Sequence, residues 1–406
     1  MDKQLFKKIA KSYDYPLILA IFMLCIFGLI MIYSSSMISA VVRFGFESDY
    51  FYQKQKVWLM IGTFVFFCMM IIPYKVFAKK KWVLTVFFGM PIVLFAVFIA
   101  GHTANNATSW FKFGSFNVQP AEFVKLGLIN YLAAVFANKQ KSLSQSDKRH
   151  VFPIYYTLFI CVLIAVQPDF GTAMIILLIC FSMIVSSGIR LKLLFKQILF
   201  LSMIVAILSP FWLPVLGDEI FSKERMSRID GFLDPFKYAD DAGFHLVNSY
   251  LAIGSGGLKG LGLGESIQKY GYLPEAHTDF IMSIIAEELG VFGVSFVIIL
   301  LSFIVLRGLM IAKKCKDAFG SLLAIGVSAM IGIQTCINLG GIAGLIPITG
   351  VPLPLVSYGG SSLLLLMASL GMLVNISMFV KYEENYKGKA ETTNLVKNSQ
   401  KRGLTF

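Results

Sequence analysis

Charged residues are scarce in this chain of 406 residues: Asp, Glu, Lys and Arg make up 15%, whereas hydrophobic residues make up 57%. A soluble globular protein usually has about a quarter of its residues charged, so an ordinary soluble protein is excluded. The residues for metal and disulfide chemistry are also few. The six cysteines form no Cys-x-x-Cys pair and only four histidines are present, so neither a zinc site nor a disulfide framework is expected.

The hydrophobic residues are gathered in blocks of about 20, the length that a helix needs to cross roughly 30 Å of hydrocarbon. The first block, Tyr15 to Tyr33, is too long for the hydrophobic region of a signal peptide and lacks a small-residue cleavage site. We therefore expect no cleaved leader and an all-α polytopic membrane protein of about ten transmembrane helices. The predicted spans are residues 15–35, 56–73, 82–100, 121–137, 152–166, 171–188, 193–216, 279–306, 318–345 and 356–380.

The net charge of +13 is distributed in a way that predicts the topology. Every second gap between the predicted spans is rich in Lys and Arg, as is typical of loops on the cytoplasmic side. Both termini are therefore expected in the cytoplasm, with residues 1–14 as the N-terminal segment, 15–381 as one membrane domain and 382–406 as a flexible tail. Topology and attraction to anionic lipid account for the basic excess, so nucleic-acid binding is not expected.

One outward segment, residues 217–278 between the seventh and eighth predicted spans, is much longer than the others. Such a long loop is usually functional or disordered. This one has aromatic residues such as Phe236 and Tyr250 among charged residues and glycines, a pattern typical of short amphipathic segments on the outer membrane surface. A second outward segment, His102 to Pro120, places aromatic residues at the depth of the membrane interface.

Asp279 is the carboxylate that best fits a chemical role. It lies where the long loop leads into the eighth span, whose helix is expected to begin near Thr278. An ionisable group at membrane depth costs roughly 3 kcal/mol on insertion scales, so each one needs a reason. One interpretation is a first-turn carboxylate stabilised by the helix dipole. The other is a general base at the mouth of a cavity, with a pKa set by partial burial and nearby cations.

Other ionisable side chains in or near the spans have structural explanations. Glu122 and Lys125 lie three residues apart at the start of the fourth span, so they share one helix face and can form an ion pair. Asp169 lies in a short Pro-Asp-Phe-Gly turn, whose chemistry explains it without a catalytic role. Glu287 and Glu288 are adjacent in the eighth span, so their side chains point in different directions.

Two glycine-rich runs and a group of cations complete the list of candidate features. The run 254–264 lacks the Gly-Lys-Ser/Thr ending of a P-loop and follows no strand, so we expect a tight bend rather than a nucleotide site. The Gly/Pro-rich run 349–362 interrupts apolar sequence, and non-helical backbone at that depth must be buried or line a cavity, so it marks the rim of one. The outward cations of the long loop can bind either a diphosphate or lipid headgroups. They are Arg225, Arg228, Lys259 and Lys269.

Several of these stretches together resemble the SEDS family (shape, elongation, division and sporulation), which contains FtsW, RodA and SpoVE. The resemblance runs from the first predicted span to the tenth, and the combination of motifs is highly specific. The stretch Gln334–Gly341 is more similar to FtsW or SpoVE than to RodA. The other matching stretches are 119–125, 167–173, 228–236, 254–269, 273–281, 287–290 and 349–362.

The resemblance implies a peptidoglycan glycosyltransferase that polymerises lipid II, with inversion and release of undecaprenyl diphosphate, on the outer face of a bacterial plasma membrane. It also implies a septal role in cell division, a class B penicillin-binding transpeptidase as partner, and other membrane proteins of the divisome. The family's catalytic aspartate falls on Asp279, and a divalent cation, Mg²⁺ or Mn²⁺, is left open as a cofactor. The expected residues for binding sugar and diphosphate are Arg228, Lys269, Glu122, Lys125, His277 and Ser357.

One departure from the family and three alternatives stay open. The family often has basic residues before Trp110, but this chain has Asn105-Asn-Ala-Thr-Ser there, so a cation would have to come from elsewhere, for example Lys112. A lipid II flippase would also have many spans and buried charges, although near the midplane rather than at one face. A non-catalytic scaffold for division proteins would not need Asp279. A RodA-like elongation role or a SpoVE-like sporulation role is the third alternative.

Overall fold

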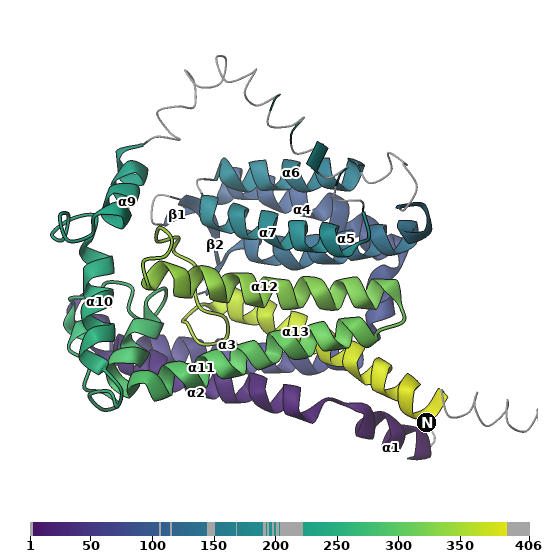
Figure 1. Cartoon of the computed structure of the whole chain (residues 1–406), viewed down its shortest axis with the longest axis horizontal. Coiled ribbons are helices and arrows are strands. Elements are labelled where there is room, and N and C mark those ends of the chain that lie inside the picture. The colour runs from purple at the N-terminus through teal and green to yellow at the C-terminus, as the bar shows by residue number, and fades with distance from the viewer. Residues whose placement is uncertain are drawn as a thin grey trace, which may run out of the picture.

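The described part of the chain is built from long helices that run side by side (Figure 1). The structure is a computed structural model, and it describes residues 3–104, 107–113, 116–143, 151–167, 169–189 and 222–387, with isolated positions between residues 189 and 222. Strands are few within these ranges, so the predicted all-α fold class is confirmed apart from one small sheet.

Nine of the ten predicted spans correspond to helices, and the seventh, residues 193–216, lies outside the described residues. Seven helices in the described part are long and apolar enough to cross a membrane, namely α2, α3, α4, α5, α11, α12 and α13. Helices α6 and α7 are apolar but shorter, with 15 and 17 residues. The bounds are α1 Lys3–Ser12, α2 Tyr15–Val42, α3 Tyr50–Ile71, η1 Tyr74–Ala78, α4 Lys80–Ala100, α5 Pro120–Leu143, α6 Val151–Ala165, α7 Phe170–Ser186, α9 Lys223–Leu233, α10 Phe244–Gly256, η3 Gln268–Tyr270, α11 Ile281–Lys314, α12 Ala318–Ile342, α13 Gly360–Tyr382 and η4 Glu383–Lys387.

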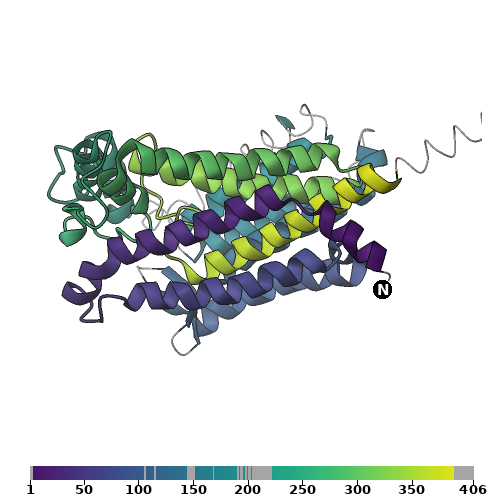
Figure 2. The same ribbon diagram turned by 90° about the horizontal axis from the view of Figure 1, so that it is seen from below.

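The helices pack around α13, which is the most enclosed of the candidate spans and lies against α3. Helix α12 contacts α11, α5 and α7, while α4 and α6 cover the far side of α5 and α7 (Figure 1). Helix α1 and the end of α13 lie at one end of the bundle, and α9 and α10 lie at the opposite end in both views (Figures 1 and 2). This arrangement is consistent with the prediction that both termini lie on one side of the membrane and the long loop on the other.

The outward segment after α4 forms a small antiparallel sheet that the sequence analysis did not predict. Its strands are β1 His102–Ala104, β2 Ala107–Phe113 and β3 Phe116–Val118, in the order β1-β2-β3. Two of the strands have only three residues, too short for an alternating pattern to be visible in the sequence. The long loop contains two short helices, α9 and α10, in the segment where short amphipathic pieces were expected.

Helix α11 is interrupted at Gly290, whose φ of 62° lies in the left-handed region. The carbonyl groups of Glu287 and Glu288, which the interruption frees, accept hydrogen bonds at 2.9 Å from two backbone amides of the run 254–264. A Cβ at Gly260 would lie only 2.2 Å from the carbonyl oxygen of Glu288. The glycines therefore let this run bend tightly against the bundle, as the sequence predicted.

Candidate functional site

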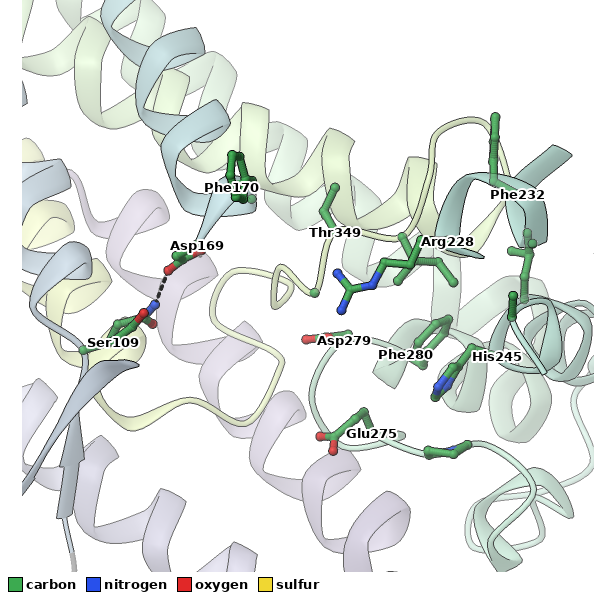
Figure 3. A pocket seen from close by; sticks show the side chains of 18 of the residues that line it. Ser109, Asp169, Phe170, Arg228, Phe232, His245, Glu275, Asp279, Phe280 and Thr349 are labelled. Atoms are coloured by element: carbon green, nitrogen blue, oxygen red, sulfur yellow. Dashed lines mark hydrogen bonds between the residues drawn. The ribbon is translucent and has the colours of Figure 1, made fainter. Parts of the chain in front are cut away.

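A cavity of about 600 Å³ lies at the end of the bundle that carries α9 and α10. The turn before α11 forms one wall, and α9, α10 and the start of α7 form others (Figure 3). Thr349 and Gly350 also line it, so the prediction that the run 349–362 marks the rim of a cavity is confirmed. The ionisable residues in the lining are Arg43, Asp169, Arg228, His245, Glu275 and Asp279.

Asp279 lies in the turn before α11 rather than in its first helical turn. The helix begins at Ile281, three residues later than predicted, and its N-cap position is Phe280, with no side-chain capping hydrogen bond. Asp279 therefore precedes the first helical turn, in which the helix-dipole interpretation had placed it. Its side chain is half-buried and projects into the cavity, as Figure 3 shows.

The backbone around Asp279 is held by two other parts of the chain. The Ser357 hydroxyl donates to the carbonyl of Thr278 at 2.6 Å, and the backbone N–H of Tyr358 donates to the carbonyl of His277 at 2.9 Å. The amide Nδ2 of Asn338 on α12 donates to the carbonyl of Asp279 at 2.8 Å. The turn is thus fixed to α12 and to the Gly/Pro-rich run, which gives the carboxylate a defined position.

The surroundings of Asp279 favour a proton-accepting role near neutral pH. Burial, and after it the neighbouring carboxylate of Glu275, raise the pKa of Asp279 to about 7, while the positive charge of Arg228 acts in the opposite direction. Glu275 adopts a left-handed φ of 56°, a strained conformation for a residue with a side chain. Its carboxylate accepts a hydrogen bond from Thr278 Oγ1 at 3.0 Å. Figure 3 shows Arg228, Glu275 and Asp279 projecting into the same space.

The cations of the cavity are Arg228 and Arg43, and the second was missed by the sequence analysis. Arg228 lies on α9, whereas Arg43 follows the end of α2, so two distant segments supply positive charge to one space. A signal for Arg43 was available, because it is a cation just after the first span on the outward side, where Lys and Arg are uncommon. Lys112 on β2 is exposed and does not line this cavity.

Lys269, predicted to bind diphosphate, is placed elsewhere. Its side chain is fully buried, and its Nζ lies 3.0 Å from Oε1 of Glu288 and 3.3 Å from the hydroxyl of Ser34. Glu287 accepts hydrogen bonds from the hydroxyl of Ser266 and from the backbone amide of Ile267. These carboxylates attach the long loop to α11, and Lys269 neutralises one of them, so its position gives no support to a substrate contact.

His277 and Ser357, also predicted to bind substrate, lie behind Asp279 and outside the cavity lining. The His277 ring packs on Phe51, with the two ring centroids 4.3 Å apart. Burial lowers the pKa of His277 to about 4, so the ring is neutral at physiological pH. Both hydrogen bonds of the Ser357 hydroxyl are to backbone groups, since it also accepts from the amide of Leu353 at 2.8 Å. The two residues support the turn from behind.

Glu122 and Lys125 form the predicted ion pair, 2.7 Å apart and buried within α5. One turn before them, Gln119 Nε2 donates to Asp169 at 2.7 Å, the hydrogen bond drawn in Figure 3. Asp169 also caps α7 by accepting from the amide of Thr172 at 3.1 Å, as its turn chemistry indicated. Glu122 and Lys125 are not in the cavity lining, and they adjoin its Asp169 wall.

Comparison with known proteins identifies the family. The model of the FtsW, RodA and SpoVE family, described as cell cycle proteins, matches residues 15–382. The chain belongs to this family. It is 55% identical over 383 residues to the probable peptidoglycan glycosyltransferase FtsW of Bacillus subtilis (strain 168), covering 94% of this chain and 95% of that protein. It is 37% identical to the stage V sporulation protein E of the same organism, covering 91% of this chain and 98% of that protein.

Solved structures agree with the fold of an FtsW, RodA and SpoVE family member. RodA of Thermus thermophilus has a TM-score of 0.63 at 25% identity, with 90% of this chain and 96% of that chain covered. A chain from a structure entitled "Structural coordination of polymerization and crosslinking by a peptidoglycan synthase complex" has a TM-score of 0.71 at 24% identity, with 91% and 98% covered. The second similarity supports the fold alone.

The metal question stays open for this family member. Within the described ranges, no group of three or more His, Cys, Asp or Glu side chains is placed to hold a metal ion. Mg²⁺ is often bound by only one or two carboxylates together with substrate phosphates. The predicted Mg²⁺ or Mn²⁺ dependence therefore stays a prediction.

Proposed function

We propose that this chain is a peptidoglycan glycosyltransferase that polymerises lipid II on the outer face of the plasma membrane. The observation that carries the proposal is a carboxylate, Asp279, whose pKa of about 7 suits a general base and which faces a cavity shared with two arginines. The 55% identity to a probable peptidoglycan glycosyltransferase supports the same reaction. The cavity lies at the end of the bundle opposite the predicted cytoplasmic termini.

The proposed reaction is a single displacement with inversion. The 4-hydroxyl of the acceptor sugar attacks the anomeric carbon of the lipid-linked donor, and Asp279 accepts the hydroxyl proton as the new C–O bond forms. The bond between the anomeric carbon and the diphosphate oxygen breaks, and undecaprenyl diphosphate leaves with the bonding electrons. Arg228 and Arg43 stabilise the negative charge that develops on the diphosphate, because guanidinium groups bind phosphate oxygens with paired hydrogen bonds.

The decisive experiment uses purified full-length protein and fluorescent lipid II, with glycan length read on a gel. The wild type should make glycan strands, and Asp279→Asn should make essentially none. Asp230→Asn is the matched control, since Asp230 is an exposed carboxylate on α9 outside the cavity lining. Chelation of divalent cations in the same assay tests the metal. Wild-type protein that moves lipid II across liposome membranes without forming glycan would instead be a flippase, and the proposal would be wrong.

The outward orientation of the cavity has its own test. Asp240 is exposed in the long loop, and Lys314 is exposed at the opposite end of α11. In a background without other accessible cysteines, Asp240→Cys should react with an impermeant thiol reagent from outside the cell, and Lys314→Cys only from inside. Labelling of the cysteine at position 240 from the cytoplasm would contradict the topology.

We further propose a septal role in cell division, with a class B penicillin-binding transpeptidase and other divisome membrane proteins as partners. The higher identity to FtsW, 55% against 37% for the sporulation protein, favours division. A fluorescent fusion should collect at the division site, depletion should give filaments, and the transpeptidase should copurify. Loss of rod shape with normal division would favour the elongation role instead.

A further inference from the structure

Asn338 on α12 makes a pair of contacts that single it out within the site. It is 4% exposed, and its Nδ2 donates to the backbone carbonyls of Asp279 and Val351, at 2.8 Å each. Both partners can only accept, so they fix the amide orientation with nitrogen toward them. One side chain therefore joins the turn that carries Asp279 to the Gly/Pro-rich run.

The other end of the same amide has no partner. Among the described residues nothing hydrogen-bonds to Asn338 Oδ1, which is buried, and buried acceptors are nearly always paired with protein or water. Asn338 and Asp279 together line a small pocket of about 10 Å³. A cavity of roughly 10–15 Å³ is the smallest that holds one water. Thr349 and Gly350 line both this pocket and the main cavity, so the two spaces adjoin at Asp279.

We propose that Asn338 is a positioning residue for the Asp279 carboxylate and that a single water in the small pocket connects them. The water donates one hydrogen to Oδ1 of Asn338 and the other to a carboxylate oxygen of Asp279. The two N–H groups of Asn338 meanwhile donate to the backbone carbonyls of Asp279 and Val351. The positioning role in catalysis deepens the proposed function and rests on it. The contacts of Asn338 and the proposed water can be tested in the folded chain without any measurement of activity.

The predicted consequence is electrostatic. A hydrogen bond donated to a carboxylate stabilises its charged form, so the water lowers the pKa of Asp279 relative to the same site without it. This hydrogen bond from the water acts against burial and the charge of Glu275, both of which raise the pKa of Asp279. The other charged or titratable groups that share the main cavity with Asp279 are Arg228 on α9, His245 on α10, Arg43 after α2 and Asp169 before α7. All of these remain when Asn338 is changed, which isolates its effect.

Two variants remove the amide. Asn338→Leu keeps the branched side-chain skeleton with the same number of heavy atoms and has no polar atom. Asn338→Thr is the alternative if the Leu variant does not fold. In the same helix the hydroxyl of Thr335 is bonded to the carbonyl of Ile331 at 2.8 Å, and a threonine at position 338 should likewise use the carbonyl four residues earlier.

Asn375→Leu is the matched control. Asn375 on α13 is a fully buried asparagine that also joins two backbone groups, donating to the carbonyl of Met70 at 2.7 Å and accepting from the amide of Tyr74 at 2.9 Å. It lies outside the linings of both the main cavity and the small pocket. Loss of a buried amide should therefore have similar effects on folding in Asn338→Leu and Asn375→Leu, and only Asn338→Leu should change the protonation of Asp279.

The first measurement does not depend on activity. A hydrophobic carbodiimide modifies protonated carboxyl groups, and mass spectrometry of the Asp279 peptide across pH gives the midpoint of its protonation. We expect the midpoint to rise by about one pH unit in the Asn338 variants, the shift that one hydrogen bond produces. It should not move in Asn375→Leu. The second measurement is the pH profile of glycan synthesis, whose acidic limb should move up by the same amount, with kcat falling and KM unchanged.

The two proposals fail separately. Midpoints that move as expected in protein that makes no glycan would support the Asn338 contact and refute the proposed function. Wild-type glycan synthesis together with an unchanged midpoint and pH profile in folded Asn338 variants would refute the positioning role. An equal shift in Asn375→Leu would also refute it, because the effect would then not depend on the pocket beside Asp279.

Discussion

Replacing Asp279 with Asn should abolish glycan synthesis and at the same time stabilise the folded protein. Loss of a general base commonly lowers a rate by about 100- to 10,000-fold, and Asn cannot accept the proton. The stabilising effect comes from the same burial that makes the base useful. A carboxylate held where its charged form is disfavoured adds to the free energy of the native state, and a neutral amide of the same shape does not.

The magnitude follows from the pKa shift. Asp279 has a pKa of about 7 in the folded protein against an ordinary value of 3.8. The folded state therefore binds more protons than the unfolded state between these values, and stability falls as the pH rises through that window. A difference of about three units corresponds to at most roughly 4 kcal/mol, at about 1.4 kcal/mol per unit. Because the carboxylate is half-buried and lines the cavity, we discount this figure to about 1–2 kcal/mol.

Thermal unfolding in detergent, at pH 5 and at pH 8, tests this reasoning beside the glycan assay. At pH 5 folded wild-type Asp279 is mostly protonated but the unfolded side chain is already mostly ionised, so the Asn variant should unfold only slightly above the wild type. At pH 8 the margin in favour of the Asn variant should be clearly larger, whereas Asp230→Asn should follow the wild type at both. An inactive Asn variant that is less stable at pH 8 would show that the carboxylate holds the turn together, and the argument from burial would be refuted.

Three further changes test neighbouring contacts. Glu275→Gln removes a negative charge that raises the pKa of Asp279, so the acidic limb of the activity profile should move to lower pH; a limb that stays in place would exclude that coupling. Arg43→Gln should raise KM for lipid II by about tenfold, the effect of roughly 1.4 kcal/mol in binding, and an unchanged KM would remove Arg43 from the diphosphate site. Glu122→Gln or Lys125→Met alone should lower the yield of folded protein, because each leaves a buried unpaired charge that costs about 3–5 kcal/mol. The double variant should recover much of that yield, and a well-folded but inactive double variant would instead assign the pair to the active site.

The sequence predicted the helical architecture well because membrane spans leave a strong local signal. A continuous apolar block must satisfy its backbone groups internally, so length and composition alone indicate a helix. The small sheet from β1 to β3 was missed because its short strands are specified by pairing between segments rather than by local pattern. The start of α11 was misplaced by three residues for a similar reason, since contacts from Asn338 and Ser357 hold residues 278–279 outside the helix.

Site residues could be predicted where their local sequence context indicates a role. They could not be predicted where the site depends on contacts between distant segments. Asp279 and Arg228 were proposed from the sequence and line the same cavity. Lys269 was also proposed, but it lies 41 positions from Arg228, and the sequence does not show which way its side chain points. In the fold it pairs with the buried carboxylate of Glu288 instead of lining the cavity. Arg43 reaches the cavity from the other end of the chain, and only the fold brings it there.

The interruption of α11 at Gly290 also bears on how this stretch changes during evolution. Because a Cβ at Gly260 would lie 2.2 Å from the carbonyl oxygen of Glu288, any substitution there forces two segments apart. Purifying selection should therefore preserve these glycines as strictly as it preserves the reactive carboxylate. A ranking of positions by sequence variability would therefore give similar ranks to glycines required for packing and to the carboxylate required for the reaction. Only an assay of purified variants, measuring fold and turnover independently, can tell a steric constraint from a chemical one at such positions.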